Sequence, residues 1–413
     1  MTRLWSTALV TTALASRNIL RNPRRTLLTL TAVIVGVAST VALAALARGV
    51  AQQLVDDSIY NLTGHLKIQH PDSARDPAVE HTIDAREESV EALQQIPGVH
   101  AVLPRIVAPA VIRSERESFP ITLFGVDPGL EGRNSVAGKA VSNGENLSDS
   151  DDSHLILGSK IVEKLETRIG RRVVVMTQDI ENEIADRGFR IEGIFQAEVQ
   201  STELLFSFTG LETLRKMLRL KDDQLHEISI LVEPEASLPE IQKQVQKLFP
   251  KAAVLTWQEL QPLVVSMTKI QNGFLIIWFL IVIVSAGFGL VNSLLMSIFE
   301  RVREIAVMHA LGMTRVWIVI ETVLQSFLLL VVGGLIGVLG GMAIVRQFSG
   351  GIDLSKFARG ASIAGIGDRI VPQLIWSDVV LVVGLLIALG TLGSLYPAWL
   401  AAQVNPARSL QRL

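Results

Sequence analysis

Four long apolar runs constrain the fold of this sequence more than any other feature. The first extends from Leu27 to Ala47 and holds no charged residue over 21 positions. At 1.5 Å per helical residue it covers roughly 30 Å, the thickness of the hydrocarbon core of a bilayer. Three later runs begin near Phe274, Trp317 and Val379. The chain is therefore predicted to be an α-helical membrane protein with four transmembrane helices, at residues 27–47, 273–299, 315–345 and 376–402.

The first run has a rival interpretation as a cleaved signal peptide, because the small residues from Ala42 to Ala47 resemble a cleavage site. The apolar region of a signal peptide spans only about 7–15 residues. Here the run is longer and 26 residues precede it. We expect an uncleaved membrane anchor.

Short basic segments set the expected orientation. Arginines precede the first span, lie between the second and third, and follow the fourth: Arg17, Arg21, Arg24, Arg25, Arg301, Arg303, Arg315, Arg408 and Arg412. With four spans these segments share one side of the membrane, and basic short segments stay in the cytoplasm. Both termini, including the tail 403–413, are expected there. Residues 48–272 and the short loop 346–375 are expected outside.

Residues 1–26 have the pattern of an amphipathic helix on the cytoplasmic membrane surface. Apolar and small residues share one stripe, whereas the basic residues that would face the lipid headgroups lie beside it: Arg17, Arg21, Arg24 and Arg25. Such a helix lies in the interfacial layer. An ordinary basic flank of the first span is the alternative, and the sequence leaves both open.

The long external segment, 48–272, has a mixed α/β pattern. Strand, helix and strand follow one another near both of its ends, which predicts two similar βαβ units forming a base, 48–118 and 213–272. The strands between them predict a β-rich insertion, 119–212. The acids of the polar stretch 142–154 could bind Ca²⁺, but the ordered D-x-D-x-D-G spacing is missing. A solvated loop is expected there.

Several kinds of chemistry are not indicated. The sequence contains no cysteine, so disulfides and thiolate sites are excluded. Its formal charge of −2 gives no basic field for nucleic acid. The nearest approach to a phosphate-binding loop, Gly132 to Ala140, has the wrong glycine spacing and no hydroxyl after Lys139. We expect no catalytic, cofactor or metal site, and any energy for work must come from another protein.

A charged segment, 300–314, separates the second and third spans. Val302, Ile305, Ala306 and His309 have the i, i+3, i+4, i+7 spacing of one helical stripe. Charged pairs three residues apart flank the stripe, but each adds only about 0.2–0.5 kcal/mol. Stability therefore does not explain the pattern, and Gly312 is placed to end the helix.

We expect this helix to dock another protein through an apolar stripe rimmed by charge. A solvated loop helix is the alternative. The expected docking residues are Glu300, Arg301, Arg303, Glu304, Ile305, Val307, His309 and Gly312.

Two features of the spans predict helix packing. Gly333, Gly337 and Gly341 lie four residues apart, a spacing that allows close approach of helices in lipid, and Gly287 and Gly289 could serve similarly. Glu321 lies inside the third span, where an acid is costly and usually functional. We expect Glu321 to contact a neighbouring span, through Asn292, and to help transmit motion of the docking helix; a purely structural hydrogen bond is the alternative.

Three motifs resemble MacB-type ABC permeases, a family with type VII ABC exporter architecture. They are E-R-x-R-E-I-A-V-M-x-A-L-G-x-T-R at 300–315, A-x-R-N-x-L-R-N-x-R-R-T-L-L-T at 15–29, and L-Y-P-A-W-L-A-A-x-x-N-P-A-x-S-L at 395–410. The family includes lipoprotein-releasing permeases, macrolide and peptide exporters, and FtsX division proteins. The resemblance covers both ends of the chain and the four-span plan.

The resemblance implies two permease subunits on two ATPase subunits, which bind ATP and Mg²⁺. The helix at 300–314 would then be the coupling helix, and the chain itself no enzyme and without a cofactor. Because no ATPase domain is fused to this sequence, the lipoprotein-releasing branch is expected, in a bacterial inner membrane with a periplasmic domain. The alternatives are efflux of peptides, drugs or siderophores, and FtsX-like regulation of a cell-wall hydrolase. The partners implied are an ABC ATPase, a second permease copy or paralogue, membrane lipid, lipoprotein or amphiphilic cargo, and a periplasmic carrier or adaptor.

Overall fold

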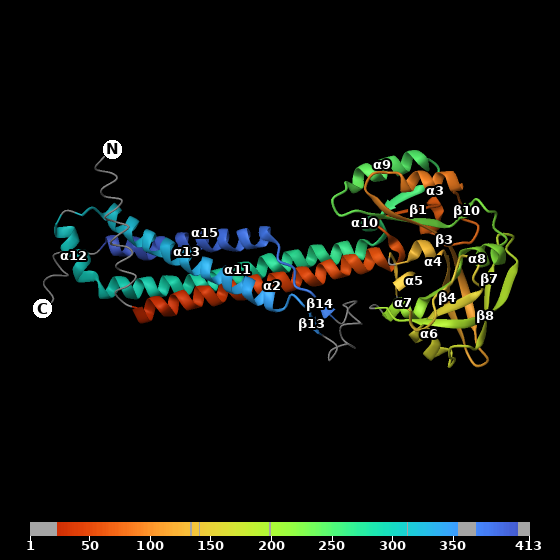
Figure 1. Cartoon of the computed structure of the whole chain (residues 1–413). Helices are drawn as coiled ribbons and strands as arrows, with labels where there is room; N and C mark the ends of the chain where they lie inside the picture. The colour runs from red at the N-terminus through yellow and green to blue at the C-terminus, as the bar shows by residue number, and fades with distance from the viewer. Residues whose placement is uncertain are drawn as a thin grey trace. The chain divides into compact units, whose positions relative to one another are not determined.

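The computed structural model describes residues 23–132, 134–139, 141–197, 200–311, 313–353 and 369–403. They divide into two compact units (Figure 1). The membrane unit contains residues 23–51, 268–352 and 370–403, and the α/β unit contains most of residues 52–267.

Four helices among the described residues are long and apolar enough to cross a membrane. They are α2 (Pro23–Ser58), α11 (Pro262–Glu300), α13 (Arg315–Gln347) and α15 (Trp376–Ala402). The first two contain 36 and 39 residues, more than the roughly 20 that a bilayer needs. Both helices continue beyond the apolar runs into mixed apolar and polar sequence, residues 48–58 after the first run and 262–273 before the second.

The four helices share one apolar core in the membrane unit. Val37 of α2, Phe279 of α11, Leu330 of α13 and Leu386 of α15 are all buried in it. Many other apolar side chains of these helices are exposed, as expected for surfaces that meet lipid. Between α11 and α13 lies α12 (Val302–Ala310), and between α13 and α15 the short strands β13 (Ile352–Asp353) and β14 (Arg369–Ile370) pair.

The base of the α/β unit consists of two interlocked βαβ elements. The first contains β1 (Leu66–Gln69), α3 (Glu87–Gln94) and β3 (Val99–Arg113). The second contains β11 (Glu227–Val232), α9 (Leu238–Leu248) and β12 (Ala253–Thr256). The sheet order is β12-β1-β11-β3 with antiparallel neighbours. Each element therefore places one strand between the two strands of the other.

The β-rich insertion continues the same sheet. β3 is 15 residues long; its first half pairs with β11 and its second half with β4. The remaining strands are β4 (Ser118–Val126), β5 (Val141–Gly144), β6 (His154–Gly158), β7 (Arg172–Gln178), β8 (Ile184–Phe195) and β9 (Phe206–Gly210). Its helices are α4 (Pro128–Glu131), α5 (Val136–Lys139), α6 (Ser159–Lys164), α7 (Gln200–Leu205) and α8 (Leu211–Leu218).

Short elements complete the α/β unit. They are the π-helical turn η1 (Ile59–Thr63), the 3₁₀ turn η2 (Pro71–Ala74), the paired strands β2 (Ile83–Asp84) and β10 (Gln224–Leu225), and α10 (Trp257–Leu260). One continuous apolar core joins base and insertion, from Leu66 in β1 to Phe189 in β8. The predicted fold class is confirmed: four transmembrane helices and a large α/β domain with a βαβ base and a β-rich insertion.

Candidate coupling site

Titratable side chains lie at both ends of α12. Arg301 occupies the N-cap position, Glu304 lies in the first turn and His309 in the last. The carboxylate of Glu304 interacts favourably with the helix dipole at the N-terminal end, whereas the guanidinium of Arg301 opposes it. Leu311 occupies the C-cap position, and Gly312 lies outside the described residues. The helix therefore has nine residues, fewer than the predicted segment 300–314.

The predicted apolar stripe of α12 faces inward. Ile305 and Ala306 are 4% and 0% exposed, and Ile305 packs with Ile298, Ile318 and Ala401. Those three partners belong to α11, α13 and α15. This corrects the expectation that Ile305 lies on the docking surface: burial of the stripe against the chain's own spans removes it from water and fixes α12 to the ends of three helices.

The opposite side of α12 carries the exposed residues. Arg303, Val307 and Leu311 follow an i, i+4, i+8 spacing, which places them on one helical face. All three are exposed, and the exposed fraction of Leu311 is 83%. We call these three residues the outer face. Leu311 was not among the predicted site residues, although its spacing from Arg303 and Val307 could have indicated it.

Ion pairs link α12 and its flanks to the spans. The guanidinium of Arg301 lies 3.3 Å from Glu304 and 3.4 Å from Glu321 of α13. Glu300, at the end of α11, lies 3.0 Å from Arg25 of α2. The pair between Arg25 and Glu300 therefore joins the end of α11 to another span.

Glu321 differs from the prediction in its partner. Its side chain is only 4% exposed, and Arg301 supplies the nearby positive charge. Asn292, the expected partner, is an exposed residue of α11. A buried carboxylate is stabilised more by a cation than by an amide. This explains why Glu321 lies beside Arg301 and not beside Asn292.

The arginines predicted to lie at the membrane surface are only partly described, and His309 of the predicted docking residues is only partly exposed. Arg17 and Arg21 lie outside the described residues, whereas Arg24 and Arg25 belong to the first turn of α2. In α12, the Nε2 atom of His309 is buried without a hydrogen-bond partner among the described residues. His309 is thus half-buried within the unit rather than fully exposed.

The glycines of α13 pack against α2. A Cβ atom built on Gly333, Gly337 or Gly341 would lie 2.7–2.8 Å from a side-chain atom of Val33, Val37 or Val41, respectively. Real Cβ atoms do not approach so closely, so glycine is what permits this separation of the helices. Gly287 and Gly289 of α11 have no such neighbour among the described residues.

A polar cluster joins three spans at the end of the membrane unit opposite α12. Arg48 of α2 binds Asp378 of α15 through two hydrogen bonds of 2.7 and 2.9 Å, and donates a third, of 2.6 Å, to Asn272 of α11. This cluster was not predicted from the sequence. The features of the sequence that could have indicated it are an arginine directly after the first apolar run and an acidic residue at the start of the fourth span.

A buried charge network lies in the α/β unit. Arg105 of β3 is 1% exposed and binds both carboxylate oxygens of Glu131 in α4, at 2.6 and 3.0 Å. It also donates to the carbonyl oxygen of Leu62 in η1. Burial opposes ionisation of Glu227 of β11, but Lys67 and Arg105 hold its pKa below the usual value. The network therefore ties the chain that follows α2 to base and insertion alike.

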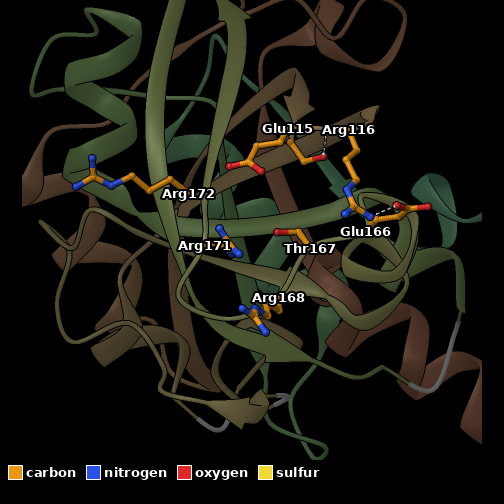
Figure 2. Close-up of a pocket in the computed structure, with 8 residues that line it drawn as sticks. Glu115, Arg116, Glu166, Thr167, Arg168, Arg171 and Arg172 are labelled. Carbon is orange, nitrogen blue, oxygen red and sulfur yellow. Dashed lines mark hydrogen bonds and ion pairs between the residues drawn. The ribbon is translucent and has the colours of Figure 1, made fainter.

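A cavity of about 230 Å³ lies in the α/β unit between the β3–β4 turn and the loop before β7. Figure 2 shows the residues that line it. Arg116 pairs with Glu166 at 2.7 Å, while Arg168 and Arg171 point toward the same space. Guanidinium groups bind carboxylates and phosphates. The cavity can hold a small anionic group, and nothing in the sequence singled it out.

Comparison with known families places the chain clearly. The model of the MacB-like periplasmic core domain matches residues 26–248, and that of the FtsX-like permease C-terminal region matches residues 276–406. The lipoprotein-releasing system transmembrane protein LolC of Xylella fastidiosa (strain Temecula1) is 21% identical over 76% of this chain and 78% of its own length.

Two further proteins are similar. The macrolide export ATP-binding/permease protein MacB 2 of Yersinia pestis bv. Antiqua (strain Antiqua) is 23% identical over 94% of this chain and 56% of its own length. The crystal structure of the periplasmic region of MacB from Actinobacillus actinomycetemcomitans aligns with 48% of this chain and 91% of that chain, at 12% identity and a TM-score of 0.35.

Proposed function

Because this chain belongs to the family of MacB-like ABC transporter permeases, we propose that it is the permease subunit of a transporter that releases lipoproteins from a bacterial inner membrane. A separate ATPase subunit would bind ATP with Mg²⁺ and supply the energy. Each buried CH₂ group holds an acyl chain in the bilayer by about 0.8 kcal/mol, so extraction of lipoproteins needs such a source.

The packing of α12 is the observation that carries this proposal. Its inner residue Ile305 contacts α11, α13 and α15, while its outer face, Arg303, Val307 and Leu311, is exposed. A partner that moves the outer face would move the ends of three spans together, because packed interiors transmit strain. We therefore assign the outer face, rather than the predicted inner stripe, to contact with the ATPase.

The remaining arrangement follows from the family and the charge distribution. Two permease subunits, identical or paralogous, would form the membrane part. Both termini would lie in the cytoplasm, and the α/β unit would lie in the periplasm, where it would meet a carrier or adaptor. The cargo would be a lipoprotein or another amphiphile taken from the membrane lipid.

Efflux is the second candidate function. The similarity to the macrolide exporter extends over 94% of this chain, more than the similarity to LolC. An exporter of this kind would move peptides, drugs or siderophores and would work with an adaptor rather than a lipoprotein carrier.

Purification of the full chain from its native membrane separates these functions. Mass spectrometry of the co-purifying proteins should identify an ABC ATPase, and reconstituted vesicles should release a lipoprotein only with ATP and a soluble acceptor. Recovery of an adaptor, with no ATP-dependent release of lipoprotein, would favour efflux. Absence of any co-purifying ATPase would contradict both functions.

A further inference from the structure

Three side chains outside the coupling site converge in the α/β unit. Nδ1 of His154, the first residue of β6, lies 2.7 Å from Oδ1 of Asp152 and 2.6 Å from Oε2 of Glu192 in β8. Each residue offers one ligand atom, and these atoms all lie within 4.8 Å of one another. One imidazole and two carboxylates form a ligand set that divalent transition metals accept.

Proton counting makes this arrangement unusual for a simple ion pair. Nδ1 of His154 carries at most one hydrogen, yet carboxylate oxygens of Asp152 and Glu192 both lie at hydrogen-bond distance from it. The two carboxylates therefore compete for one donor and repel each other. A divalent cation in place of that hydrogen would satisfy all three ligand atoms.

Two of the three ligand separations lie close to those found around a zinc ion. Ligand atoms about 2.0 Å from a tetrahedral zinc ion lie roughly 3.3 Å apart. The two short separations would have to widen by about 0.6–0.7 Å to reach this spacing. Exposed fractions of 36% for the His154 side chain and 34% for that of Glu192 leave room for this movement and for a water ligand.

Asp152 is held in place for such a role. The backbone N–H and hydroxyl of Ser148 donate to its Oδ2 atom, at 2.8 and 3.0 Å, and the N–H of His154 donates to Oδ1 at 2.9 Å. The carboxylate is therefore oriented before any ion arrives.

A β-bulge positions the third ligand. In the β6–β8 pairing, Leu155 is opposite Ile191 and Ile156 is opposite Gly193, so Glu192 is the extra residue. Bulges redirect side chains and are frequent beside functional sites. The irregularity in β8 thus occurs at the residue whose side chain reaches His154.

We propose that Asp152, His154 and Glu192 bind a divalent transition-metal ion of the zinc class. The ion ties the loop between β5 and β6 to β8. The proposal is independent of lipoprotein release, because it concerns a structural cation within the α/β unit.

The test uses the full chain in detergent, stripped of metal with a chelator. Isothermal titration with Zn²⁺ compares the wild type with Glu192→Gln and His154→Ala. We expect the wild type to bind one equivalent of Zn²⁺. Either variant should bind Zn²⁺ with an affinity at least about 10-fold lower. Glu192→Gln replaces a partly exposed carboxylate by an isosteric amide, so it should fold even if His154→Ala does not; melting of the metal-free proteins checks this.

Two control variants separate this site from other clusters. His70, Asp72 and His81 form a second group with similar spacing, and Glu181 belongs to an acidic group beside Arg219. His81→Ala and Glu181→Gln should bind Zn²⁺ at the proposed site with the same affinity as the wild type. Equal zinc affinity in the wild type and Glu192→Gln, or no bound zinc at all, would show that the three residues form only a hydrogen-bonded cluster. Stoichiometric binding of Ca²⁺ without Zn²⁺ would overturn the assigned class of metal.

Discussion

Arg301, at the N-cap of α12, lies 3.4 Å from Glu321 inside α13. The pair joins the connecting helix to a span by charge, next to the apolar contact that Ile305 makes with Ile318. Two different kinds of interaction therefore hold α12 against α13. This redundancy would suit the coupling role that we propose for α12.

The Arg301–Glu321 pair should show energetic coupling. Arg301→Gln and Glu321→Gln should each destabilise the membrane unit, since each leaves a partly or fully buried charge beside a neutral amide. The double variant should lose about 1–3 kcal/mol less than the sum of the two losses. Equilibrium unfolding in mixed micelles measures the three differences, and strictly additive losses would show that the two side chains do not interact.

Ile305 and Leu311 should respond differently to truncation. Ile305→Ala removes a buried contact and should cost about 2–5 kcal/mol of stability. Leu311→Ala should leave the melting temperature nearly unchanged but weaken association with the ATPase, because Leu311 is 83% exposed. Melting in detergent and co-purification of the ATPase measure the two effects. Full ATPase recovery with Leu311→Ala and Leu311→Asp would remove the outer face from the coupling site.

Gly337 and Gly287 form a matched pair of intramembrane glycines. Gly337→Ala places a methyl group 2.7 Å from Cβ of Val37, and overpacking of this kind costs about 1–3 kcal/mol. Gly287→Ala has open space among the described residues and should be neutral or slightly stabilising, since alanine favours helix. Unfolding in mixed micelles compares them. Equal stability of the two variants would contradict the close packing of α2 on α13.

Stability of the α/β unit should fall as the pH drops below the ordinary histidine pKa of 6.5. Burial lowers the pKa of His226, although its hydrogen bond to the carbonyl of Val79 opposes the shift. The unfolded chain then binds a proton at a higher pH than the folded chain, so acidification favours unfolding. His65, whose pKa is lowered by burial, acts in the same direction.

His226→Gln tests this assignment. The variant keeps an amide donor for Val79 but cannot titrate, so its unfolding free energy should depend less on pH between 7.5 and about 5. Denaturant unfolding at several pH values gives the slope. Carboxylates with lowered pKa values, such as Glu227, lose their contribution only at more acidic pH. An unchanged slope in His226→Gln would exclude His226 as the titrating group.

Some of this architecture could be predicted from sequence, because the signals are local. An uncharged run such as Leu27–Ala47 has few structures open to it other than a span. The base follows from a strand–helix–strand order that occurs twice, and β3, α3, β11 and α9 all lie where that order places them.

Other features depend on residues far apart in the chain. An apolar stripe such as Ile305–Ala306 looks the same whether it meets another protein or the chain's own spans, so its direction could not be inferred. Arg105 belongs to a strand that otherwise reads as apolar, and its partners Glu131 and Ser229 lie 26 and 124 residues away. The spacing of Gly333, Gly337 and Gly341 indicated a close helix contact but not that α2 would be the partner.

The pairing of β1 with β12 has a consequence for how such chains diversify. Leu66 lies directly opposite Thr256, so the points where the polypeptide joins and leaves the globular body are neighbours across one ladder. A domain whose two ends lie close together can be inserted into a chain or replaced as a unit. It can be exchanged, enlarged or shortened without rerouting the helices that precede and follow it in the chain.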